Sequence, residues 1–147
     1  MSFYPSNEMV AVQWLKGITY LGNRVATELP TDNSSWSASG FVTVAAVGGT
    51  PHMYVPLRRP VLSVDCWGVT PNSGKPPWRL AHQLASEIYV AILNHPVVPR
   101  PLTMPSGYMG ARVMTAIPRS EPVRVPGDVA SYAHFSMDVE MQWTVTS

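Results

Sequence analysis

Few residues in this chain are of types that carry out catalysis, and Asp65 is the most conspicuous of them. It is a lone carboxylate in the middle of an apolar run rich in β-branched residues. The alternation of that run predicts a strand on which Ser63, Asp65 and Trp67 share one face. Such a carboxylate could act in catalysis, face water or pair with an arginine, for which Arg58 or Arg59 of a neighbouring subunit is a candidate.

The other reactive residues do not form a catalytic or metal-binding pattern. Cys66 shares its strand face with Leu62 and Val64, so we expect a buried thiol that acts as a small apolar side chain. The four histidines are scattered, with no i, i+4 pair and no second cysteine to complete a zinc site. We therefore expect no catalytic residue, no metal and no cofactor, and no enzyme activity. A small hydrolase whose site escapes this reasoning remains an alternative.

The clearest structural signal is a long alternating segment near the C-terminus. From Ala133 to Val145, apolar residues occupy every second position and polar residues lie between them. This period of two is typical of a strand with one buried face. We expect the strand to close an antiparallel sheet that apolar elements cover on one side. Asp138 and Glu140 fall on its polar face, where they would meet solvent or a neighbouring subunit.

Two amphipathic helices are predicted to cover that sheet. The first follows the N-cap residue Ser6, and the second runs from about Pro77 to Leu93. Each carries apolar residues at helical spacing: Ala11, Trp14, Leu15 and Ile18 in the first, and Ala81, Leu84, Ala85, Ile88, Ala91 and Ile92 in the second. Both stripes and the apolar face of the last strand are expected to share one core.

Shorter strands complete the expected fold. Four further runs have the composition of strands, at residues 24–29, 41–47, 61–67 and 112–117. Gly48-Gly49 is expected to form a turn after the second of these runs. The order of elements predicts a single α+β domain, with a mostly antiparallel sheet and two main helices packed on one face, over residues 1–147.

Three connecting segments are expected to lack secondary structure. The polar loop at 31–39 is expected to expose Trp36, and a second loop spans residues 119–128. Prolines are dense in the segment at about 95–107, where they remove hydrogen-bond donors and fix the backbone. We expect a Pro-rich loop or arm there, which either crosses over irregularly or reaches a neighbouring molecule.

The composition favours contact with other protein. The charged content is 13%, about half the usual share, and the chain has five tryptophans and eight methionines. Interfaces are depleted in charged residues and enriched in aromatic residues and methionine. Trp36, Trp67 and Trp78 lie outside the predicted core stripes, so they could anchor a subunit or stack on sugars or bases.

The charge and the termini indicate which partners and compartments to expect. A net charge of +1 gives no basic field for nucleic-acid binding that is independent of sequence. One cysteine cannot form an intrachain disulfide. The first residues lack the pattern of a signal peptide, and no apolar run approaches the ~20 residues that span a bilayer. We expect synthesis in the cytosol and no membrane insertion.

Several short phrases in this chain occur in a characteristic order. They are the capped helix that ends in Trp14-Leu15-Lys16, the segment Val25–Pro30, the strand that ends in Val47-Gly48-Gly49, and the segment Arg59–Gly68 followed by a helix rich in alanine and leucine. Over roughly residues 6–94 this pattern resembles the tail terminator proteins of long-tailed bacteriophages, especially those of actinobacterial hosts.

The resemblance implies an α+β subunit of a hexameric ring in the virion, at the junction of tail and neck. The ring would cap the tail tube, end its polymerisation and join the tail to the head connector or neck protein, and DNA could pass through its lumen. Such a structural protein has no catalytic residue. The long Pro-rich stretch departs from the family pattern.

Five residues are our candidates for subunit or tail-tube contacts, and three other functions stay open. The candidates are Arg58, Arg59, Asp65, Trp67 and Trp78. Another connector, neck or tail-completion protein is the nearest alternative, since small α+β subunits of that kind also form rings. A ligand-binding module that uses exposed tryptophans and the small hydrolase belong to different classes.

Overall fold

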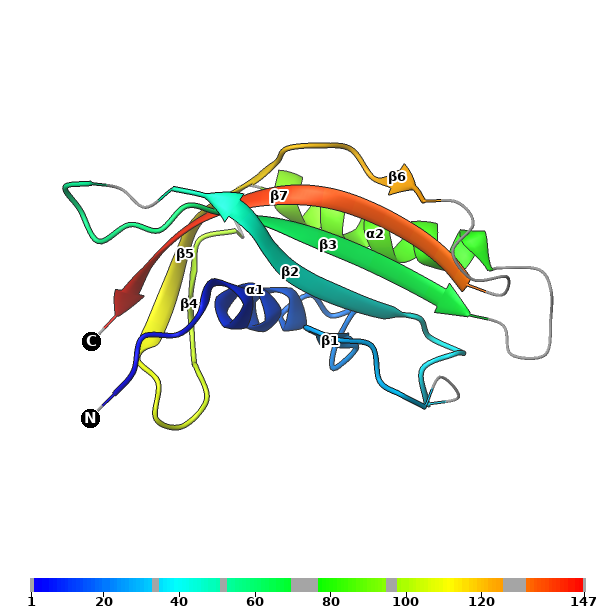
Figure 1. Ribbon diagram of the computed structural model, residues 1–147, viewed down its shortest axis with the longest axis horizontal. Coiled ribbons are helices and arrows are strands. Elements are labelled where there is room, and N and C mark those ends of the chain that lie inside the picture. Colours follow the sequence, from blue (N-terminus) through cyan, green and yellow to red (C-terminus); the bar gives the residue numbers. More distant parts are fainter. Residues whose placement is uncertain are drawn as a thin grey trace.

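One curved sheet joins all the strands of the computed structural model, which describes residues 2–32, 35–50, 53–69, 77–94, 98–125 and 132–146. The elements, shown in Figure 1, are α1 (Asn7–Lys16), β1 (Val25–Ala26), β2 (Phe41–Gly49), β3 (Pro60–Val69), α2 (Trp78–Leu93), β4 (Arg100–Leu102), β5 (Gly110–Pro118), β6 (Val123–Arg124) and β7 (Tyr132–Thr146). The strand order is β1-β2-β3-β7-β5-β4, and β6 also pairs with β7. Of these pairings, β1–β2 is parallel and the others are antiparallel, which confirms the α+β class.

The alternating C-terminal strand lies in the interior of the sheet. β7 pairs with β3 along one edge and with β5 and β6 along the other. The expectation that it closes the sheet is therefore wrong. The alternation gives the buried face of a strand but not its neighbours, and here the connection through α2 leaves β3 free to pair with a strand that comes much later in the chain.

Both helices pack on the same face of the sheet. The predicted stripes supply most of their buried residues, and these join the apolar face of β2, β3, β5 and β7 in one core. The hydroxyl of Ser6 accepts a hydrogen bond from the backbone N–H of Met9 at 3.1 Å and caps α1, as expected. Among the described residues, no helix combines the length and apolarity needed to cross a bilayer.

Gly48 and Gly49 belong to β2, so the turn expected there is wrong. They pair with Val61 and Pro60 after a register shift in the strand. Gly49 has a φ of +104°, and a Cβ atom there would lie 2.2 Å from the carbonyl oxygen of Arg59. Glycine is required at this position because the two backbones approach closely, and a composition typical of turns cannot reveal that reason.

Two connecting segments contain short strands that the sequence did not predict. β4 lies in the Pro-rich segment, and Pro101 pairs with Arg112 of β5 at the edge of the sheet. Proline is tolerated on an edge strand because its missing N–H need not join a ladder. β6 lies in the segment predicted as the loop 119–128. Residues 95–97 and 126–128 of these segments fall outside the described residues.

Candidate functional site

The sheet face opposite the helices is the candidate site, and we refer to it as the open face. Side chains on the helix face are mostly buried, whereas those on the open face are mostly half-buried. Its central side chains come from three adjacent strands: Thr43 of β2, Ser63, Asp65 and Trp67 of β3, and His134, Ser136, Asp138 and Glu140 of β7. These polar and aromatic groups are covered by none of the described helices.

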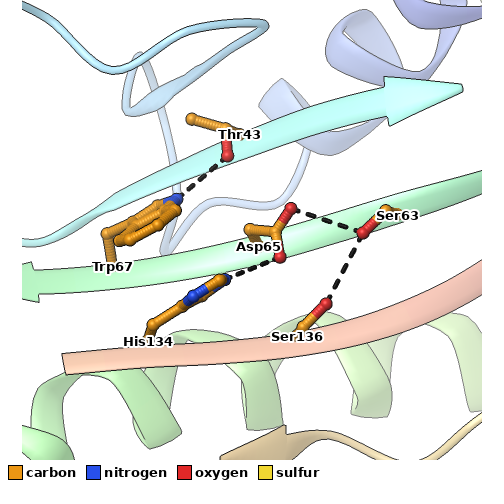
Figure 2. Close-up of polar contacts among 6 residues, drawn as sticks. All are labelled: Thr43, Ser63, Asp65, Trp67, His134 and Ser136. Atoms are coloured by element: carbon orange, nitrogen blue, oxygen red, sulfur yellow. Dashed lines mark hydrogen bonds and ion pairs between the residues drawn. The ribbon is translucent and has the colours of Figure 1, made fainter. Parts of the chain in front are cut away.

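The centre of the open face is a histidine held between a carboxylate and an indole ring (Figure 2). The register pairs Trp67 with His134, whose rings stack with centroids 3.8 Å apart and planes 14° from parallel. His134 Nε2 lies 2.7 Å from Asp65 Oδ1, and the two side chains are only 15% and 20% exposed. The pair is thus a short, largely desolvated hydrogen bond with one ring face covered by an indole.

Hydroxyl groups complete the hydrogen-bond network shown in Figure 2. Ser63 Oγ donates to Asp65 Oδ2 at 3.3 Å and lies 3.5 Å from the hydroxyl of Ser136. The indole N–H of Trp67 donates to Thr43 Oγ1 at 3.0 Å. Each of these side chains is therefore fixed by a partner on a neighbouring strand or on its own strand.

The network determines the charge state of Asp65. Burial alone would raise the pKa of its carboxyl group, because desolvation disfavours the charged form. Hydrogen bonds from His134 and Ser136, the charge of His134 and the hydroxyl of Ser63 act in the opposite direction, and together they hold the pKa below its ordinary value. The open face thus carries a carboxylate that remains ionised at neutral pH.

The arrangement does not contain an activated nucleophile among the described residues. The second ring nitrogen of His134, Nδ1, is buried and has no hydrogen-bond partner there, and the hydroxyls of Ser63 and Ser136 lie beside the carboxylate instead. A hydrolytic triad needs the hydroxyl on one ring nitrogen and the carboxylate on the other. Cys66 points into the core, as expected, where burial raises its pKa.

No metal-binding cluster is formed by the residues described. Across these segments, three or more His, Cys, Asp or Glu side chains do not come together at any point. Asp65 and His134 alone would supply two ligands, and their short hydrogen bond to each other occupies the atoms that a cation would need.

An aromatic cluster adjoins the network at the end of β3. Trp36, Phe41 and Val69 form a second buried cluster, and Trp67 and Tyr132 pack against it. The ring of Tyr132 meets Trp36 edge-on with centroids 5.9 Å apart. The expectation that Trp36 is exposed is wrong, since its loop folds over this end of the open face. The polar composition of residues 31–39 indicates a loop at the surface, but it cannot show which side chains that loop packs against.

The burial of the tryptophans bears on the ligand-binding alternative. Trp14, Trp36 and Trp143 are buried, and Trp67 and Trp78 are partly buried. A module that stacks sugars or bases needs an exposed aromatic face. One ring face of Trp67 stacks on His134, and the guanidinium of Arg124 lies over the ring of Trp78, so neither of the two partly buried tryptophans is freely exposed.

The five predicted contact residues lie in three places. Asp65 and Trp67 come together in the network of the open face. Arg58 and Arg59 lie at the other end of β3. Trp78 is on the helix side, at the start of α2. The structure therefore unites two of the five.

Intrachain contacts engage each of the other three. The guanidinium of Arg58 lies 5.7 Å from the ring centroid of Tyr4 and 5.4 Å from that of Trp143. Arg59 Nε donates to the carbonyl oxygen of Thr50 at 3.3 Å. The ring of Trp78 lies 4.0 Å beneath the guanidinium of Arg124. Asp65 pairs with His134 of its own chain, so it does not need an arginine from elsewhere.

Sequence reasoning missed His134 and Ser136 as members of the site. The alternation of β7 does place both on its polar face, which was the available signal. Their partners depend on the register between β3 and β7, strands separated by about 70 residues of chain. The ion pair between Glu140 and Arg119, at 3.0 Å, likewise depends on the pairing of β5 with β7, which the sequence does not predict.

Comparisons with known proteins do not identify the chain. It matches no protein-family model and no curated protein. A solved structure of a protein whose name describes no function aligns with 97% of this chain and 96% of its own, at 18% identity and a TM-score of 0.43. A likeness at this level carries no argument about fold or function.

Proposed function

We propose that this chain is a tail terminator subunit of a long-tailed bacteriophage, which assembles with other copies into a ring on the end of the tail tube. The observation that supports the proposal most is the open face, on which half-buried aromatic and charged side chains are fixed while none of the described helices covers them. The low charged content and the order of short sequence phrases point the same way.

The side chains of the open face are already fixed in place, which suits this face to bind another protein. Side chains that are already held by hydrogen bonds lose little rotamer entropy when a partner covers them. Asp65, His134, Ser63 and Trp67 are held in this way. The aromatic rings provide apolar contact area, and Asp138 provides a carboxylate that has no cation within 4.0 Å among the described residues.

The function follows from ring closure. If each subunit presents two different surfaces to its neighbours, head-to-tail contacts close a ring and leave no free edge for growth. One side of a ring of this kind, hexameric by resemblance, would bind the last ring of tail tube protein, and the other would bind the head connector or neck protein. Polymerisation of the tube would end there, and DNA would pass through the lumen. The protein would act at the junction of tail and neck in the virion.

Two rivals keep different amounts of support. Another head–tail connector, neck or tail-completion protein would use the open face in the same way, and only its partners would distinguish it. A small hydrolase would need the His134 ring to contact a nucleophile, and in the described residues the Nδ1 atom has no partner. We therefore retain the neck protein as the second candidate.

Negative-stain imaging of the purified protein tests the proposal. We expect closed rings with a lumen. Asp138→Arg, which places a cation on the open face, should abolish them. Glu87→Arg is the matched control, because it makes the same charge reversal on the exposed outer side of α2. A wild-type protein that stays monomeric even with tail tube protein would contradict the proposal. Rings that persist in Asp138→Arg would show that the open face does not form them.

A further inference from the structure

The connection between β2 and β3 presents the most exposed apolar residues of the described chain. Met53 and Tyr54 are 83% and 85% exposed, and Val55 beside them is also exposed. We refer to these three residues as the tip. Adjacent exposed apolar side chains of this kind are typical of a surface that another molecule covers.

The tip is held out from a fixed base. The carbonyl oxygen of Pro56 accepts a hydrogen bond from the hydroxyl of Thr144 at 2.9 Å. The backbones of Arg58 and Trp143 exchange two hydrogen bonds of 2.8 and 3.0 Å. Figure 1 shows the connection between β2 and β3 extending beyond the end of the sheet. The tip is therefore positioned to contact another molecule.

The base of the tip carries two arginines. Among the residues described, no carboxylate lies within 4.0 Å of Arg58 or Arg59. A hollow of about 360 Å³ opens between Arg59 and the edge of the open face, where Arg119 and Glu140 form their ion pair. The apolar tip is thus followed by two positively charged residues where the connection joins β3. This combination is complementary to an apolar surface that contains a carboxylate.

The open face contains a surface of that kind. Asp138 has no cation within 4.0 Å among the described residues, in contrast to Asp65 and Glu140. Val123 pairs with Ser136, and Ile117 pairs with Glu140, so exposed apolar residues lie on both sides of Asp138 along β7. This surface, defined by Ile117, Val123 and Asp138, combines exposed apolar side chains with a carboxylate, and it therefore complements the apolar tip and its arginines.

We infer that the tip of one copy packs against Ile117 and Val123 of the next copy, with Arg59 directed at Asp138. The inference rests on the proposed function and specifies the contact that would close the ring. Because the two surfaces are different parts of the chain, the contact is head-to-tail and can be repeated around a ring. The rim of the open face is then covered by a neighbouring subunit, and not by a ligand.

Cysteine crosslinking tests the contact directly. The double variant Tyr54→Cys, Val123→Cys should form disulfides between copies under mild oxidation and give a ladder of bands up to the closed ring on a non-reducing gel. Tyr54→Cys, Val90→Cys is the matched control, since Val90 on α2 is as exposed as Val123, at 60% against 57%. The native Cys66 is buried and should not compete.

The outcomes separate this inference from the proposed function. A ladder in Tyr54→Cys, Val123→Cys that is missing from Tyr54→Cys, Val90→Cys supports the contact. Rings seen by imaging without that ladder, or equal ladders in both pairs, overturn the contact and leave the ring itself standing. A wild-type chain that never assembles overturns both.

A single substitution provides a second test that does not depend on disulfide geometry. Tyr54→Ser should raise the concentration for half-assembly by about tenfold or more, the loss expected for a buried interface aromatic. The thermal midpoint of the monomer should change little, because the side chain is 85% exposed there. Val90→Ser should leave assembly unchanged. Unchanged assembly in Tyr54→Ser would overturn the contact.

Discussion

The pair formed by Asp65 and His134 leads to a prediction that can be worked out in detail. Replacing Asp65 by asparagine removes the charge from a 2.7 Å hydrogen bond between two largely buried side chains. A hydrogen bond to a charged group contributes about 1.5–3 kcal/mol to folding. Asparagine keeps one acceptor oxygen for His134, so we expect the lower end of this range, a loss of about 1.5 kcal/mol.

The assay is thermal unfolding, followed by circular dichroism below the concentration at which rings form. For a chain of this length, 1 kcal/mol corresponds to roughly 2–4 °C in the midpoint, so Asp65→Asn should unfold about 3–6 °C lower at neutral pH. Asp138→Asn is the matched control on the same face of the sheet. It should change the stability by less than about 0.5 kcal/mol, because no cation lies within 4.0 Å of Asp138 among the described residues.

The pH dependence gives an independent check on the cause. The folded protein holds the pKa of the Asp65 carboxyl group below its ordinary value. Its contribution is therefore present above the unfolded pKa and is lost as the pH falls through the folded pKa. The stability gap between wild type and Asp65→Asn should be constant near pH 6 and shrink below about pH 4. A variant as stable as wild type at pH 6, or a gap that does not depend on pH, would refute this reasoning.

Three further predictions concern the backbone, the aromatic cluster and the thiol. Gly49→Ala should lower the free energy of unfolding by more than about 2 kcal/mol in urea titrations, because its Cβ would lie 2.2 Å from the carbonyl oxygen of Arg59. Gly48→Ala has no atom within 4 Å of its Cβ and should be close to neutral. Trp36→Ala should cost roughly 3 kcal/mol or more and weaken the near-ultraviolet dichroism, since this ring is buried against Phe41 and Tyr132. The Cys66 thiol should react with Ellman's reagent only after unfolding, because burial keeps it neutral and inaccessible, and rapid reaction in the native protein would contradict its position in the core.

The sequence predicts the helices and the inner face of the sheet well, because local periodicity reports burial directly. The capping by Ser6, the stripe of α2 and the alternation of β7 each depend on residues a few positions apart. The errors arise where a residue's role depends on distant chain. The need for glycine at position 49 comes from the backbone of Arg59, and the burial of Trp36 depends on its contact with Tyr132.

The candidate site illustrates the same limit. The alternation of residues 61–67 predicts that Asp65 and Trp67 share a strand face, and they do. The histidine that binds them comes from a strand about 70 residues away, and no local pattern specifies the register that brings it there. The same limit applies to Arg58 and Trp78. Their residue types suggest contact residues, but the sequence does not predict that Arg58 contacts Trp143 and Trp78 contacts Arg124 within the same chain.

The central claim is that this chain assembles into a closed ring, and its mass in solution tests that claim most directly. Light scattering of the purified protein should give about six times the chain mass of 16.1 kDa, with a constant value over a range of concentrations. A mass that stays at 16.1 kDa at all concentrations, also in the presence of tail tube protein, would contradict the account.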